Sequence, residues 1–255
     1  MNKTITQAII LAAGQGLRLR PTTENFPKYL IELRGNKSLL ELSIEKISRM
    51  GIKNILIVVG HERDKIINRC SHIYGDLEIQ YIQNREYLTS GTMESLASVC
   101  GLLEKNFLLL ESDILYDYKI IEALMNSDHP NVIFAGKPFN MGDDVLISVD
   151  PNISHLVRDI GKSIGINTMD KESFIGISKI SRTFAQSVID EWFQKYKKIN
   201  TYYSYEEVFV KVSNETAAYQ DKLYMVSNHD LNWGEIDTHE DLEFISKVVG
   251  TFTLH

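Results

Sequence analysis

A glycine-rich segment that follows the first apolar run constrains this chain most. Residues 8–11 are apolar and predict a buried opening strand, and Gly14 and Gly16 come directly after it. Because glycine has no Cβ, the backbone N–H groups of such a loop can approach an anion closely. Arg18 and Lys28 add a fork-shaped cation and a point cation in the same stretch. The segment therefore predicts a binding site for a nucleoside triphosphate.

This segment matches neither of the two common phosphate-binding glycine loops. A P-loop requires Gly-Lys-Ser or Gly-Lys-Thr at this position, and a dinucleotide-binding turn requires a third glycine where this chain has Leu19. The segment instead resembles the signature of the nucleotidyltransferases that activate sugars and small phosphorylated alcohols, Gly-x-Gly-x-Arg-x-x-Pro-x-Thr-x-x-x-Pro-Lys. The matching positions are Gly14, Gly16, Arg18, Pro21, Thr23, Pro27 and Lys28. The resemblance implies that the nucleotide is bound by Leu11, Ala12, Ala13, Gly14, Gly16 and Arg18.

Composition limits the partners of the chain. The 255 residues suit one α/β domain, and the net charge of −7 argues against broad binding to nucleic acids or anionic membranes. No apolar run reaches the roughly 18 residues of a membrane span, and the N-terminus carries no apolar signal region. Cys70 and Cys100 have no metal-ligand spacing and fit a reducing compartment. We therefore expect a cytoplasmic protein that acts on small molecules.

The first half of the chain alternates apolar strands with amphipathic helices. This alternation predicts a Rossmann-like, mainly parallel sheet with helices on both faces. Ligands of such sheets bind at the carboxyl ends of the strands. Strands are expected at 8–11, 55–59, 79–82, 107–110 and 132–135, and helices at 38–50, 61–70, 92–103 and 120–125.

The pattern changes after Gly136, where turns separate short strand-like runs. We expect a small antiparallel addition that binds the acceptor, within one domain that covers residues 1–255. Residues 1–135 would then form the nucleotide-binding part and residues 136–255 the acceptor-binding part. The expected strands are 145–149, 154–160, 173–180 and 223–226, and the expected helices are 181–196 and 242–249.

Two acidic pairs are candidates for metal binding. Glu111 and Asp113 end an apolar strand, and Glu235 and Asp237 form the same two-apart pair near the C-terminus. Residues two apart on a strand share a face, and Mg²⁺ prefers one or two carboxylates together with phosphate oxygens. Resemblance to the sugar and phosphocholine enzymes implies that Asp113 and Asp237 hold Mg²⁺. The alternatives are a helix cap or Asx-turn for Asp113 and a solvated or supporting role for Glu235.

The stretch from Gln83 to Leu96 joins a strand to a helix and is expected to meet the base and ribose. Relatives often have Gly-Thr at this helix start, as Gly91 and Thr92 are here. Gln83 or Asn84 could read the edge of the base through amide hydrogen bonds. A plain helix cap at Ser90 or Thr92 is the alternative interpretation, and both can hold together.

The chain resembles most closely the cytidylyltransferases of phosphonate and phosphocholine metabolism, and among them the 2-aminoethylphosphonate enzymes. The resemblance implies transfer of CMP from CTP to a phosphonate or phosphate monoester, with release of pyrophosphate. Arg18 would then bind the leaving phosphates, and Lys28 would bind the α-phosphate or the acceptor. The stretches that carry the resemblance are 84–87, 90–96, 108–116, 142–145 and 233–237.

The sequence does not decide whether the acceptor carries a primary or a quaternary ammonium group. Asp143 or Asp144 and Glu206 or Glu207 suit a primary ammonium, whereas the aromatic run 202–205 suits a quaternary one. Phosphocholine, another phosphomonoester, a sugar 1-phosphate and a non-catalytic nucleotide-binding role are the rival interpretations. A homodimer and a longer fusion protein are both compatible with the sequence. The residues expected around the acceptor are Lys28, Glu111, Asp144, Tyr205, Glu206 and Trp233.

Overall fold

A computed structural model describes residues 5–34, 36–71, 75–138, 143–162, 164 and 172–253. Gly142, which belongs to one of the stretches quoted above, lies outside these ranges. Among the described residues, no helix is both long enough and apolar enough to cross a bilayer.

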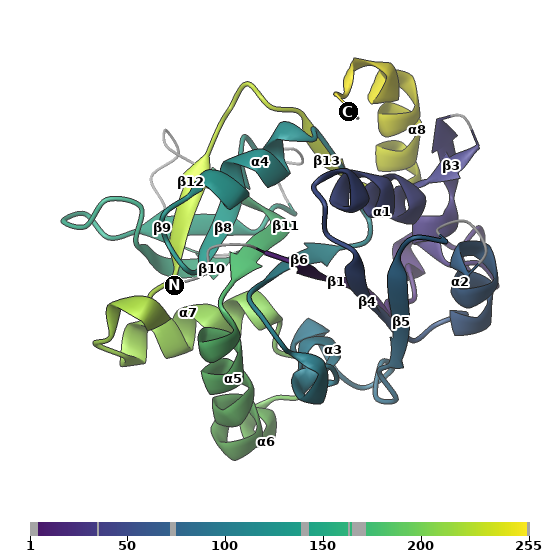
Figure 1. The fold of residues 1–255 in the computed structure, drawn as a ribbon. Coiled ribbons are helices and arrows are strands. Elements are labelled where there is room, and N and C mark those ends of the chain that lie inside the picture. Colours follow the sequence, from purple (N-terminus) through teal and green to yellow (C-terminus); the bar gives the residue numbers. More distant parts are fainter. Residues whose placement is uncertain are drawn as a thin grey trace.

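One half of the central sheet is parallel, as the alternation predicts. Its strands lie in the order β6-β1-β4-β5, with β1 paired to both β4 and β6 (Figure 1). The inner strands are continuous apolar runs because helices cover both of their faces. Their bounds are β1 Gln7–Ala12, β4 Asn54–Val59, β5 Glu78–Gln83 and β6 Phe107–Glu111.

The second half of the chain extends the same sheet. The long strand β11 pairs antiparallel with β6, and it also pairs with β8 and β9, so the expected antiparallel addition is continuous with the parallel half. Two short ribbons, β7–β13 and β2–β3, lie outside this sheet. Bounds are β8 Val132–Gly136, β9 Leu146–Val149, β10 Val157–Gly161, β11 Glu172–Ile180 and β12 Tyr224–Ser227. For the ribbons they are β2 Glu32–Arg34, β3 Lys37–Ser38, β7 Ile114–Tyr116 and β13 Trp233–Glu235.

Helices cover the sheet on two sides, which Figure 1 shows with α1 and α4 opposite α3, α5 and α7. Alternate residues of β1 separate the two layers of the core. Ile9 and Leu11 pack with α3, α5 and α7, and Ala8 and Ile10 pack with α1, α2 and α4. The bounds are α1 Leu39–Arg49, α2 Arg63–Cys70, α3 Thr92–Ala97, α4 Lys119–Asn126, α5 Arg182–Glu191, α6 Lys197–Ile199, α7 Tyr205–Glu215 and α8 His239–Val248.

Two helices differ from the expectation. The helix expected at 92–103 ends at Ala97 and continues as a 3₁₀ turn at Cys100–Leu102. α7 is not among the helices expected from the sequence, because the aromatic run 202–205 at its start is also compatible with a cage. The missed signal is a capping box, in which Ser204 and Glu207 bond each other's backbone N–H groups at the start of the helix.

Lys46 is buried within the layer of core that α1 forms. Its Nζ donates a hydrogen bond to the carbonyl oxygen of Tyr116 at 2.7 Å and lies 4.0 Å from the centroid of that tyrosine ring. Burial lowers the pKa of Lys46 to about 7, although the charges of Asp117 and Glu45 act in the opposite direction. The folded protein therefore loses a proton near neutral pH that the unfolded chain keeps.

We expect this lysine to make stability depend on pH. Between the folded pKa of Lys46 and its unfolded value the unfolded chain binds more protons, so the free energy of unfolding should rise with pH. Relative to Lys46→Met, the wild type should gain about 2 kcal/mol between pH 7 and pH 9 in urea titrations. Lys53→Met, at an exposed lysine, is the control and should keep the wild-type slope. Equal slopes in wild type and Lys46→Met would contradict the assignment.

Candidate active site

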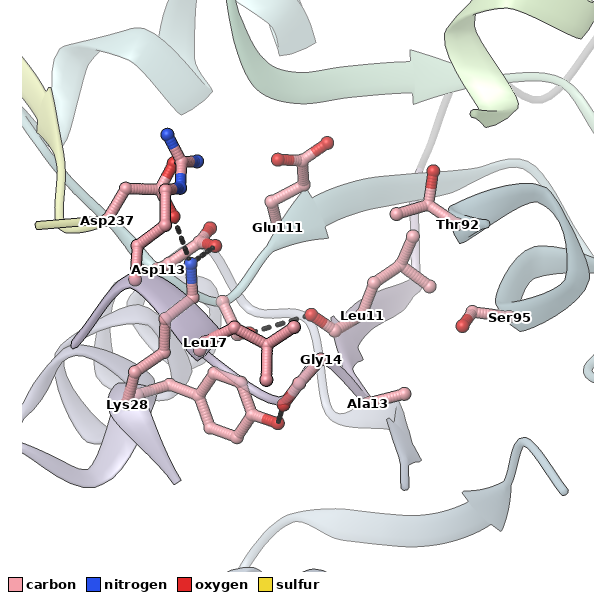
Figure 2. Close-up of a pocket in the computed structure, with 14 residues that line it drawn as sticks. Leu11, Ala13, Gly14, Leu17, Lys28, Thr92, Ser95, Glu111, Asp113 and Asp237 are labelled. Atoms are coloured by element: carbon pink, nitrogen blue, oxygen red, sulfur yellow. Dashed lines mark hydrogen bonds and ion pairs between the residues drawn. The ribbon is translucent and has the colours of Figure 1, made fainter. Parts of the chain in front are cut away.

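A cavity of about 370 Å³ lies at the carboxyl edge of the parallel strands, where the sequence places the phosphate-binding loop (Figure 2). The loop after β1, the start of α3, the end of β6 and the residue group after β13 form its walls. Among the predicted nucleotide-binding residues, Ala12, Gln83, Asn84 and Gly91 do not line it. The lining residues are Leu11, Ala13, Gly14, Gly16, Leu17, Arg18, Lys28, Tyr29, Thr92, Ser95, Glu111, Ser112, Asp113 and Asp237.

Hydrogen bonds from two buried hydroxyl groups fix the glycine-rich loop. Tyr29 donates to the carbonyl oxygens of Ala12 at 2.6 Å and Gly14 at 3.0 Å, and Thr23 donates to that of Gly16 at 2.6 Å. Gly16 has a φ of +60°, which favours glycine, and a Cβ there would lie 3.3 Å from side-chain atoms of Lys28 and Thr23. The signature threonine thus fixes the shape of the loop.

Lys28 joins the two predicted metal-binding aspartates. Its Nζ lies 2.5 Å from Asp113 Oδ2 and 2.6 Å from Asp237 Oδ1, as Figure 2 shows. Burial by itself would lower the pKa of Lys28, but the two carboxylates outweigh it and the pKa is raised. Arg18 forms ion pairs with Asp237 and with Asp143 while its side chain stays about half exposed. Both cations of the signature therefore sit on carboxylates of the site.

Three carboxylates converge beside this lysine. Oxygens of Glu111, Asp113 and Glu235 lie within 4.8 Å of one another. Burial, followed by the charges of Asp113 and Asp237, raises the pKa of Glu235 to about 10. Burial and the charge of Asp113 also raise the pKa of Glu111. Oδ1 of Asp113 is buried, and no described residue hydrogen-bonds to it. This is a set of hard oxygen donors that a divalent cation would suit.

The cluster differs in membership from the pair expected from the sequence. Asp237 is engaged by Lys28 and Arg18, and Glu235, which the sequence reading ranked below it, lies with Glu111 and Asp113. β13 pairs antiparallel with β7 through Glu235 and Ile114, next to Asp113 in the chain. This pairing, together with a hydrogen bond from the Ile236 N–H to the carbonyl oxygen of Asp113 at 3.0 Å, places the C-terminal acidic pair beside the end of β6.

A second cavity of about 190 Å³ adjoins the first and shares Arg18, Thr92, Glu111 and Asp237 with it. Of the predicted acceptor residues, this cavity brings together Glu111, Asp144, Glu206 and Trp233, whereas Lys28 lines the first cavity only. Asp143, Lys162, Phe174 and Ser204 complete much of its wall.

Tyr205, also predicted to contact the acceptor, lies behind the second cavity. Its ring is fully buried against Phe174 and Phe209, and its hydroxyl donates to Glu111 Oε1 at 3.0 Å. Its backbone N–H donates to Thr92 Oγ1 at 3.2 Å. Tyr205 therefore joins the start of α7 to α3 and to the end of β6.

Of the two residues expected to read the base, Asn84 contacts Ser95 and Gln83 does not. Asn84 is buried, and its Nδ2 donates to Ser95 Oγ at 3.0 Å, while the exposed Gln83 accepts from Arg63 at 2.7 Å. Neither amide lines the first cavity, but Ser95 does. The sequence reading missed Ser95, although it follows Thr92 by three positions and so shares a helix face with it.

Gly91 begins α3 without a side-chain cap, so neither Ser90 nor Thr92 caps this helix. A Cβ at Gly91 would lie 2.3 Å from the carbonyl oxygen of Tyr203 and 2.4 Å from that of Tyr202. The Gly91 N–H donates to the carbonyl oxygen of Thr201 at 2.9 Å. The segment before α7 is thus packed directly on the start of α3, and only glycine permits this approach.

Comparisons with known proteins agree with this geometry. The bifunctional protein GlmU of Methanococcus vannielii is 36% identical over 135 residues, which are 53% of this chain and 31% of that protein. The CMP-5'-(3-aminopropyl)phosphonate synthase of Streptomyces rubellomurinus is 26% identical over 132 residues, 52% of this chain and 21% of the synthase. The chain therefore spans less than a third of the length of either relative.

The fold matches solved structures over nearly the whole chain. The CTP:phosphocholine cytidylyltransferase LicC of Streptococcus pneumoniae superposes with a TM-score of 0.78 at 22% identity, covering 96% of this chain and all of LicC. The sequence model of the family described as nucleotidyl transferase matches residues 7–134, which hold the glycine-rich loop, the start of α3 and the acidic end of β6. With half of its length matched, and with the signature cations and aspartates gathered in one cavity, the chain belongs to the nucleotidyl transferase family of enzymes.

Proposed function

We propose that this protein transfers CMP from CTP to a small phosphonate, 2-aminoethylphosphonate, and releases pyrophosphate. The observation that carries the proposal is Lys28, held between Asp113 and Asp237 in the cavity that adjoins a second one. Such an arrangement can hold a polyphosphate in one cavity and an anionic acceptor at their shared wall. The names of the Streptomyces synthase and of LicC favour a cytidine nucleotide and a phosphonate or phosphocholine acceptor.

The proposed step is an in-line displacement at phosphorus. A phosphonate oxygen of the acceptor forms a bond to the α-phosphorus of CTP, and the bond from that phosphorus to the bridging oxygen breaks, so pyrophosphate leaves with the electron pair. No general base is needed because the acceptor oxygen is already anionic near neutral pH. Arg18 would stabilise the leaving phosphates, and Lys28 the charge at the α-phosphate or the acceptor.

Mg²⁺ fits the donors of the site. We propose that Asp113 and Asp237 hold it. Glu111 and Glu235 lie beside Asp113, and the unpartnered Oδ1 of Asp113 supports a cation at that point. When bound, the ion would supply electrostatic stabilisation of the phosphate charge. Arg18 and Lys28 could then exchange their aspartate partners for the phosphate groups of the nucleotide.

The nucleoside would lie against α3 and the loop after β1. We propose that Thr92 and Ser95 contact it, that Asn84 orients Ser95, and that Gly91 sets the position of the helix start. Residues 1–135 would then bind the nucleotide and residues 136–255 most of the acceptor. Phosphocholine and other phosphomonoesters are the second candidates, because LicC shares the fold and acts on phosphocholine by its name.

A substrate panel tests the proposed reaction. Pyrophosphate release should require Mg²⁺, CTP and 2-aminoethylphosphonate, and chelation by EDTA should abolish it. The panel pairs CTP, UTP, ATP, GTP and dTTP with aminoethylphosphonate, phosphocholine and glucose 1-phosphate. Turnover only with UTP or dTTP and the sugar phosphate would refute the cytidylyltransferase proposal, and no turnover with any pair would refute catalysis.

Substitutions at the ion pairs test the assigned roles. Asp113→Asn and Lys28→Ala should each lower kcat by at least about 100-fold, because each removes a charge that would stabilise the transferring phosphate. Lys37→Ala, at an exposed lysine paired with Glu45, is the control and should keep the wild-type rate. Thermal unfolding of each variant checks that the fold persists. Near-normal rates in folded Asp113→Asn and Lys28→Ala would exclude these roles.

A further inference from the structure

The wall of the second cavity contains a buried carboxylate whose bonding is incomplete. Glu206, the second residue of α7, lines this cavity and has only 8% of its surface exposed. Its Oε2 is buried, and no described residue donates a hydrogen bond to it. Burying a carboxylate oxygen without a hydrogen-bond donor costs free energy of folding. A ligand that donates a hydrogen bond to this oxygen would remove that cost.

Three other acidic residues in or beside the wall of this cavity have partners of their own. Asp143 forms ion pairs with Arg18 and Lys162, and Glu207 closes the capping box of α7 through Ser204. Glu111 accepts the hydroxyl of Tyr205. The two cations of the cavity wall, Arg18 and Lys162, both pair with Asp143, and the buried oxygen without a donor belongs to Glu206.

We infer that Glu206 determines acceptor specificity by binding a primary ammonium of the substrate; this inference rests on the proposed function. A primary ammonium carries three N–H donors and can satisfy Oε2, whereas a quaternary ammonium has none and would leave that oxygen unpaired. The aromatic run before α7 does not form a cage here, because Tyr205 is buried behind the wall and Tyr202 is 63% exposed.

The surroundings of Glu206 set its protonation state in a way that agrees with this role. Burial raises the pKa of Glu206 to about 7, while the positive charge of Lys162 acts to lower it. A cation beside Glu206 would favour the ionised carboxylate.

Trp233 forms another part of the cavity wall. Its Nε1 donates a hydrogen bond to the carbonyl oxygen of Lys137 at 2.9 Å, and the edge of its ring packs on Gly136.

The test compares two acceptors that differ only in the amine, 2-aminoethylphosphonate and ethylphosphonate, with CTP and Mg²⁺. The wild type should prefer the amine by roughly 10- to 100-fold in kcat/KM, since hydrogen bonds to charged groups contribute more than neutral ones. Glu206→Gln should lose most of this preference by slowing turnover of the amine alone. Glu207→Gln is the matched control, because the glutamine oxygen can still accept the capping hydrogen bond. Its kcat/KM for each of the two acceptors should stay near the wild-type value.

The outcomes separate this inference from the proposed function. Turnover of both acceptors by the wild type without preference, or an equal loss on both acceptors in Glu206→Gln, would overturn the role of Glu206 while leaving cytidylyl transfer intact. Phosphocholine turned over as well as phosphoethanolamine would also overturn it. A wild type that turns over neither phosphonate and neither phosphate ester with CTP would refute the proposed function itself.

Discussion

A buried ammonium between two carboxylates organises the centre of this molecule. Lys28 comes from the segment after β1, Asp113 from the end of β6, and Asp237 from the chain beyond β13, so one ion-pair network joins three distant parts of the sequence. A buried charge is tolerated only when it is paired, and removing either partner is costly. The same requirement that stabilises the network thus brings together the groups that we propose act on the phosphates.

Local patterns predict much of the fold. The continuous apolar runs of β1, β4 and β6 predict strands covered on both faces, and two predicted helices begin where expected, at the N-caps Ser38 and Ser181. The matched signature from Gly14 to Lys28 also predicts the cavity, because its spacing places two cations on one loop. These features depend on residues close together in the chain, and a single sequence contains them directly.

Features that depend on distant pairing could not be read in the same way. Glu235 joins Glu111 and Asp113 only because β13 pairs with β7, and three-residue strands leave almost no periodic signal. The hydrogen bond from Tyr205 to Glu111 depends on α7, and the aromatic residues around the start of this helix do not form a helical pattern in the sequence. Asn84 donates a hydrogen bond to Ser95, eleven positions further along the chain, and the residue type of Asn84 alone does not predict this partner.

The close approach at Gly91 has a consequence for how such an enzyme could change its substrate. The carbonyl oxygens of Tyr202 and Tyr203 lie within 2.4 Å of the position that a Cβ of residue 91 would take. The segment that carries them continues directly into Tyr205 and Glu206 at the start of α7. A bulkier residue at Gly91 would displace residues 202 and 203, and with them the start of α7, which carries Glu206 in the wall of the second cavity. The start of α3 lines both cavities through Thr92, so a backbone shift at Gly91 would change the shape of both cavities together.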